Sequence, residues 1–90
     1  MYNPRASAYR QISASSNVCP FPASITSVFC SSSTSGTCTV FDDRGTGTAI
    51  RMVDTFPLVA GQTYLLDFIG AAGINVVIGG AASITVGYQQ

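Results

Sequence analysis

Few side chains in this sequence could carry out chemistry. Asp42 and Asp43 form the one adjacent acidic pair, and they precede Arg44-Gly45-Thr46-Gly47. Neighbouring side chains in a strand point to opposite faces, so the two carboxylates are poorly placed to share a proton. The run also lacks the alternating Asp/Asn pattern and the closing Glu of a calcium loop. We therefore interpret this pair as a solvated turn end, although a cation site there is conceivable.

Catalysis is disfavoured by the residues that are missing. The sequence has no His, Lys or Glu, so its Ser and Cys side chains have no partner base to activate them. The glycines of Gly45-Thr46-Gly47 are not followed by the Lys of a phosphate-binding loop. We predict that the chain is not an enzyme, with no catalytic residue and no cofactor.

Three cysteines, Cys19, Cys30 and Cys38, show no CxxC spacing and have no His beside them. This pattern predicts no metal site. A Cys30–Cys38 bridge across a hairpin is possible, and the spacing alone leaves it open. Free Cys is among the most buried residue types, so we expect these side chains to serve as small core hydrophobes.

The composition favours burial against another protein. Only 9% of the residues are charged, and the net charge is zero. Four scattered Arg do not form the basic patch that nucleic-acid binding needs. The most apolar stretch, residues 68–82, is Gly-rich and too short for a membrane helix. A surface of Ser, Thr and apolar groups costs less to desolvate than a charged one.

Short apolar runs of period 2 alternate with turn signals, and no window has a helical period. We predict an all-β fold, a small antiparallel β-sandwich or barrel-like, jelly-roll-like domain of about six to seven strands. Residues 1–20 are expected to form an extended N-terminal arm, with one possible strand, and residues 21–90 the sandwich. The loops between strands include a polar loop at 31–36 and a tight hairpin at Gly79-Gly80. The predicted strands are 24–30, 37–42, 48–56, 62–69, 73–78 and 82–88.

Two predicted strands, 64–69 and 74–78, are apolar on both faces. In a two-layer sandwich one face of each sheet should be exposed to solvent. The second apolar face of these strands therefore suggests contact with another subunit, or else a barrel-like centre. In the first strand we expect Ile25 and Phe29 on one face and Val28 on the other.

The chain from Ile25 onward resembles small virion proteins of tailed bacteriophages. The resemblance covers about two thirds of the chain and is carried by turn glycines, strand alternation and a closing Tyr. It implies a β-sandwich of the capsid decoration, or cement, type, which often forms trimers on the head, and it supplies no catalytic residues. The matching segments are 36–42 (GTCTVFD), 57–64 (PLVAGQTY) and 73–88 (GINVVIGGAASITVGY).

The leading hypothesis is therefore a decoration protein that stabilises a phage head as a homotrimer. Its expected partners are other copies of itself and the major capsid protein, with no nucleic acid and no membrane. Its expected location is the virion, after assembly in the host cytoplasm. Tyr and Arg are enriched at interfaces, so the predicted contacts in the arm are Tyr2, Arg5, Tyr9 and Arg10. A head–tail connector, tail or fibre-base component is the alternative, and a carbohydrate-binding sandwich is the third.

Overall fold

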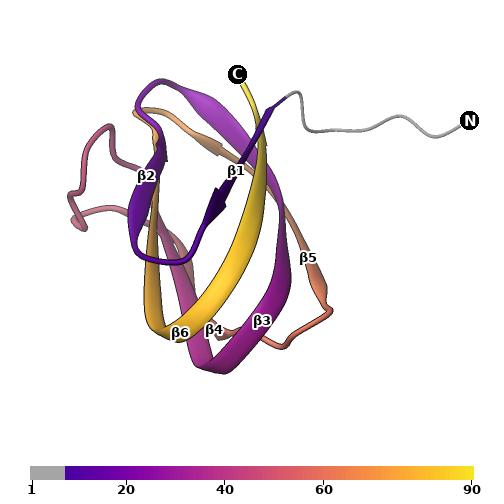
Figure 1. Cartoon of the computed structure of the whole chain (residues 1–90). Helices are drawn as coiled ribbons and strands as arrows, with labels where there is room; N and C mark the ends of the chain where they lie inside the picture. The colour runs from indigo at the N-terminus through magenta and orange to yellow at the C-terminus, as the bar shows by residue number, and fades with distance from the viewer. Residues whose placement is uncertain (1–7) are drawn as a thin grey trace, which may run out of the picture.

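Two long antiparallel strands, β3 (Ala23–Phe41) and β6 (Ile74–Gln89), form the centre of the fold (Figure 1). The computed structural model describes residues 8–90. Every strand pairing in this part of the chain is antiparallel, in one six-stranded sheet without helices, so the predicted all-β class is confirmed. The shorter strands are β1 (Ala8–Ile12), β2 (Ser16–Cys19), β4 (Arg51–Pro57) and β5 (Thr63–Gly70).

The sheet folds back on itself because β3 and β6 both bend in the middle (Figure 1). The first layer contains β1, the C-terminal half of β6, the N-terminal half of β3, and β5. The second layer contains β2, the other halves of β6 and β3, and β4. The core lies between the layers, and its fully buried side chains include Ile25, Ile84 and Val86 of the first layer and Val40 and Ile74 of the second.

The expected loop at 31–36 and the expected hairpin at Gly79-Gly80 are both wrong, because each segment continues its strand through the bend. Extra residues in β3 shift its register against β6 between Cys30 and Ser32 and again between Thr34 and Thr37. Such bulges bend a strand and increase its twist. Gly80 has φ +68°, and a Cβ there would collide with the Ser35 carbonyl oxygen, so this close approach requires glycine.

A third bulge, nearer the start of β3, reverses the expected faces of the first predicted strand. Against β6, β3 carries one extra residue between Ile25 and Ser27. Ile25 and Val28 therefore both point into the core at 0% exposure, whereas Phe29 points outward and is 41% exposed. The prediction paired Ile25 with Phe29 because strict alternation takes no account of an inserted residue.

Within the segment 1–20, the described residues form β1 and β2, which pair with opposite halves of β6. Ile12, Val18 and Cys19 belong to the core cluster. Two of the predicted contact residues, Tyr2 and Arg5, lie outside the described residues. No helix in the described part of the chain is long and apolar enough to cross a membrane.

Candidate functional site: an uncharged outer face and an apolar groove

The paired residues on the outward face of the first layer carry no charged side chain, and the exposed Asp67 of β5 lies at the register shift between Leu65 and Phe68. Paired residues share a face of a sheet, and the pairings place Tyr9, Gly87, Ser27 and Leu65 in one row across all four strands. The next outward rows combine Gln11, Thr85, Phe29 and Thr63 on one side, and Gln89, Ser24 and Ile69 on the other. We call these eleven residues the outer face.

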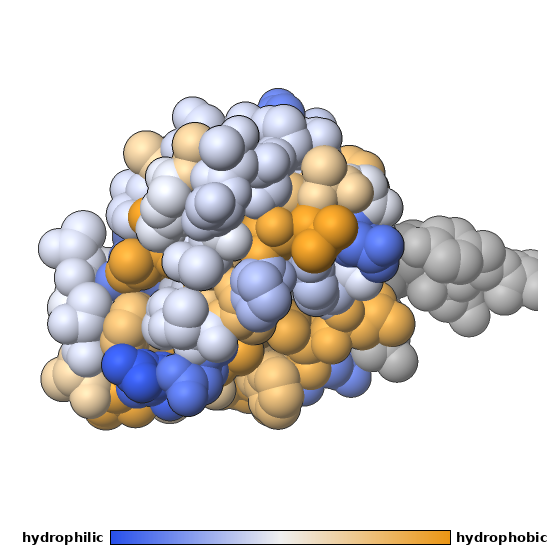
Figure 2. Space-filling view, turned by 90° about the horizontal axis from the view of Figure 1, so that it is seen from below, coloured by the Kyte–Doolittle hydropathy of each residue, from blue (hydrophilic) through white to orange (hydrophobic). Residues whose placement is uncertain are grey.

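Large apolar side chains are displayed on this outer face. Ile69 is 78% exposed and Leu65 is 73% exposed, and Phe29 and Tyr9 are also exposed. The hydroxyl, amide and glycine residues between them bear no charge. Figure 2 views the molecule from the side of the β3 and β6 bends, where near-white and orange atoms cover most of the surface and strong blue is confined to small patches. A surface of this kind is typical of one that becomes buried against another protein.

The outward face of the second layer is covered by the chain itself. The connection 42–50 between β3 and β4 folds over this face and is anchored to it by two amides (Figure 1). Asn17 Nδ2 donates to the Gly45 carbonyl at 2.7 Å, and Asn75 Nδ2 donates to the Gly47 carbonyl at 3.1 Å. Phe41 and Asn75 are consequently buried. The second apolar face predicted for 74–78 is therefore covered within the chain, whereas that of 64–69 is open.

Asp42 and Asp43 organise this connection and its neighbour. The Asp42 carboxylate accepts hydrogen bonds from the backbone N–H groups of Ala72, Ala71 and Gly73 at 2.8, 3.0 and 3.3 Å. These bonds, led by the one from Ala72, lower the pKa of Asp42 despite some desolvation. Asp43 Oδ2 accepts from Gly45 and Gly47 at 2.8 and 2.9 Å. The two carboxylates thus bind separate turns, and residues 8–90 contain no cluster of three or more His, Cys, Asp or Glu that could hold a metal.

All three cysteines are free and buried, so Cys30 and Cys38 do not form a disulfide. Burial raises the pKa of the Cys38 thiol to about 12. The Sγ atoms of Cys19 and Cys30 donate to the carbonyls of Phe21 and Ser32, two residues further along the chain in each case. Their role is that of small core side chains, and protonated buried thiols are poor nucleophiles.

An apolar groove of about 820 Å³ lies between β4 and β5. In the described chain each of these strands pairs only with β3, at different halves of it, so the bend in β3 separates them. Leu58 N–H donates to the Gly36 carbonyl, and Gly61 N–H donates to the Cys30 carbonyl, which fixes the β4–β5 connection to the β3 bend. A closed barrel would pair β4 with β5, whereas here the sheet is open.

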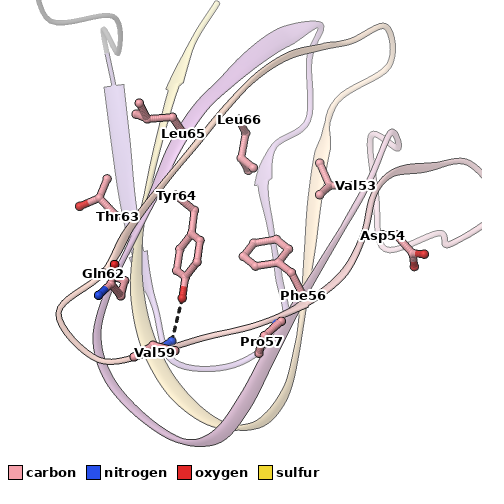
Figure 3. A pocket seen from close by; sticks show the side chains of 10 residues that line it. All are labelled: Val53, Asp54, Phe56, Pro57, Val59, Gln62, Thr63, Tyr64, Leu65 and Leu66. Carbon is pink, nitrogen blue, oxygen red and sulfur yellow. Dashed lines mark hydrogen bonds between the residues drawn. The ribbon is translucent and has the colours of Figure 1, made fainter.

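The groove walls are the outermost side chains of the core. Val53, Phe56, Tyr64 and Leu66 are partly buried and point toward one another, whereas Leu65 points away (Figure 3). The Phe56 and Tyr64 rings meet at 5.1 Å between centroids. The Tyr64 hydroxyl accepts a hydrogen bond from the Val59 N–H at 2.9 Å, which fixes the ring against the connection between β4 and β5. Asp54 is the one charged residue of the lining, and it forms an ion pair with Arg51 at 2.9 Å.

The predicted contacts Tyr9 and Arg10 do not act together. Tyr9 lies on the outer face and is 75% exposed. Arg10 lies on the opposite side of β1, where its Nη1 donates to the Asn17 carbonyl at 3.1 Å and links β1 to β2. Sequence reasoning missed Leu65 and Ile69 as individual contact candidates, although the two-faced apolar pattern of 64–69 was the available signal.

No protein family, curated protein or solved structure significantly matches this chain. The described surface offers apolar contact area and uncharged hydrogen-bonding groups. This arrangement can bind protein.

Proposed function

We propose that this chain is a structural protein of a virion, a decoration protein that forms a homotrimer and binds the major capsid protein. The observation that supports this most strongly is the open outer face of the first layer, with Tyr9, Phe29, Leu65 and Ile69 exposed among uncharged residues. The resemblance of residues 36–42, 57–64 and 73–88 to small virion proteins is the reason for proposing a phage capsid as the partner of this face.

The energetics favour assembly through this face. Each Å² of apolar surface removed from water stabilises a contact by roughly 25 cal/mol, and a standard interface buries about 800 Å² on each partner. Ser, Thr and Gln side chains lose less on desolvation than ionised groups do. The paired, uncharged residues of this face can therefore be buried without requiring a complementary charge at every position.

The geometry is compatible with a neck or tail position as well as with a head position, and the number of copies separates the two. We expect mass spectrometry of purified virions to find the chain in numbers comparable to the major capsid protein. A number that corresponds to one ring would assign the chain to the connector or tail, and absence from virions would refute the proposal.

The outer face is tested by Leu65→Asp and Ile69→Asp, introduced singly into the full chain. Each places a carboxylate at an exposed position, so we expect folding to persist while trimer formation and binding to undecorated capsids are lost. Thr46→Asp is the matched control, because Thr46 is exposed on the connection that covers the other layer. Unchanged sedimentation and capsid binding of both outer-face variants would exclude this face as the contact.

A further inference from the structure

The connection between β2 and β3 holds an aromatic side chain outside the core. It consists of Pro20, Phe21 and Pro22, and Phe21 is 60% exposed. We propose that Phe21 of one copy inserts into the β4–β5 groove of the next copy, a contact that rests on the homotrimer proposed above and names its interface. Each copy contributes a different surface to this contact, which is therefore head to tail. Contacts of this kind close into a ring when the rotation permits.

A trimer needs two different contact surfaces on each copy, because a single self-complementary face generates a dimer. In a trimer the outer face must therefore meet a different surface of the next copy, and Phe21 is an exposed apolar group that lies outside the outer face. The groove adjoins the outer face, since Thr63 and Leu65 belong to both. A neighbouring copy anchored in the groove would consequently cover part of the outer face as well.

The connection between β2 and β3 presents Phe21 in a nearly fixed position. The residues on either side of it, Cys19 and Ala23, are buried in the core. Cys19 Sγ donates to the Phe21 carbonyl at 3.4 Å. Pro20 and Pro22 fix their own φ angles, and Pro22 also restricts the residue before it to extended backbone. Little conformational freedom is therefore left for Phe21 to lose on binding, which favours association.

The groove suits an inserted aromatic side chain. Its volume of about 820 Å³ falls within the range of roughly 300–1,000 Å³ typical of pockets that enclose a ligand. Aromatic rings prefer tilted or offset contacts with other rings, and each ring buries roughly 150–250 Å². The apolar and aromatic walls that point toward one another are Val53, Phe56, Tyr64 and Leu66 (Figure 3).

Charge does not oppose this contact. The connection that carries Phe21 has no charged residue between β2 and β3. Asp54 is the one charged residue of the groove lining, and its ion pair with Arg51 is largely exposed. Insertion of an uncharged ring can therefore leave this ion pair intact and buries no unpaired charge.

Phe21 and the groove lie toward opposite ends of the molecule, so the partner is a second copy. The connection between β2 and β3 lies at the end opposite to the bends of β3 and β6 (Figure 1). Ala23, just after this connection, pairs with Gly70 at the end of β5. The groove is lined instead by 63–66 at the start of β5 and by the β4–β5 connection, which is bonded to the β3 bend. Phe21 accordingly does not line the groove of its own chain.

Photo-cross-linking of the full chain tests this contact. Benzoylphenylalanine is introduced in place of Phe21, and the irradiated protein is separated on a denaturing gel before its cross-links are mapped by mass spectrometry. We expect covalent dimers that are joined within residues 53–66. The same probe in place of Ile50 is the matched control and should give little of this product, because Ile50 is similarly exposed, at 63%, and lies outside the groove lining. Cross-links within one chain, dimers joined elsewhere, or no product from position 21 would each overturn the inference.

Substitution of Phe21 measures how much the contact contributes. Phe21→Ser changes an exposed residue, so the fold should survive. The concentration at which half of the chains are assembled should rise about tenfold or more in sedimentation, because aromatic side chains dominate interface energetics. Phe21→Leu keeps an apolar side chain and should retain most of the assembly, and Ile50→Ser should leave it unchanged. Equal assembly of Phe21→Ser and the wild type would contradict the proposed contact.

A groove variant supplies the complementary test. Val59→Asp places a carboxylate in the groove lining at an exposed residue, so the fold should survive while the yield of dimer from position 21 falls about tenfold or more. Ala60→Asp, one residue further on, changes an exposed residue outside the lining and should leave the yield unchanged. These measurements need no virion, so their failure is distinguishable from failure of the decoration role, which is measured by copy number and capsid binding.

Discussion

At the scale of single residues, the charged groups of this protein stabilise its connections. Asp42 bonds the backbone of residues 71–73, Asp43 bonds that of 45 and 47, and Arg51 lies over the Phe41 ring at 5.8 Å from its centroid. The sequence correctly indicated that the Asp pair is no proton-sharing site, because their side chains serve different turns. It could not indicate their partners, because 29 to 31 residues separate Asp42 from the N–H groups that it binds.

Asp42→Asn tests this role. The substitution removes a charged acceptor from three N–H groups, so we expect a loss of about 1 kcal/mol in the free energy of unfolding at pH 7. The lowered pKa of Asp42 contributes stability above the unfolded-state pKa, which is lost as the pH falls through the folded-state pKa. The difference between wild type and variant in urea denaturation should therefore shrink on acidification.

Asp54→Asn is the control for Asp42→Asn. Asp54 is largely exposed, and its Oδ1 accepts from Arg51 and from the N–H of the next residue, Thr55, at the surface, so we expect a change within about 0.5 kcal/mol. A pH-independent loss in Asp42→Asn equal to that in Asp54→Asn would show that the bonds to residues 71–73 contribute nothing.

At the scale of elements, alternation predicted where the segments of β3 to β6 lie but not how they join, and it missed β2. The runs 24–30 and 37–42 are halves of β3, and 74–78 and 82–88 lie within β6. Serine-rich and Gly-Gly sequences are typical of turns. Here they form bends within continuous strands, because β3 and β6, which are distant in the sequence, pair along their length. The bulge between Ile25 and Ser27 has no local signal either, which is why the outward position of Phe29 was not foreseen.

Gly80→Ala tests the bend. Gly80 has φ +68°, and an added Cβ would meet the backbone of Ser35. Gly61→Ala is the matched variant, because Gly61 has φ +86° and nothing within 4 Å of an added Cβ. Positive φ alone costs roughly 1–2 kcal/mol for alanine, so both variants should lose this much. We expect thermal unfolding to show a clearly larger loss for Gly80→Ala, and equal losses would mean that the close approach to Ser35 imposes no constraint.

At the scale of the whole molecule, low charge and an uncovered apolar face predict how assembly responds to salt. Contacts that depend on charge weaken as the Debye length falls from about 10 Å at 0.1 M to about 3 Å at 1 M salt. Because the outer face carries no charge in register, we expect sedimentation to show the same oligomer across this range of NaCl. Dissociation at high salt would indicate that charged groups outside this face hold the copies together.

The pairing of Ser24 with Gln89 also constrains how the protein is made. β1, β2 and β3 all require β6 as a partner, and β6 is the last of these six strands along the chain. A nascent chain therefore cannot complete either layer until β6 has left the ribosome. Before β6 emerges, β3 would present an unpaired apolar edge, so prompt folding once β6 is available is needed to keep neighbouring chains on a polysome from pairing with one another.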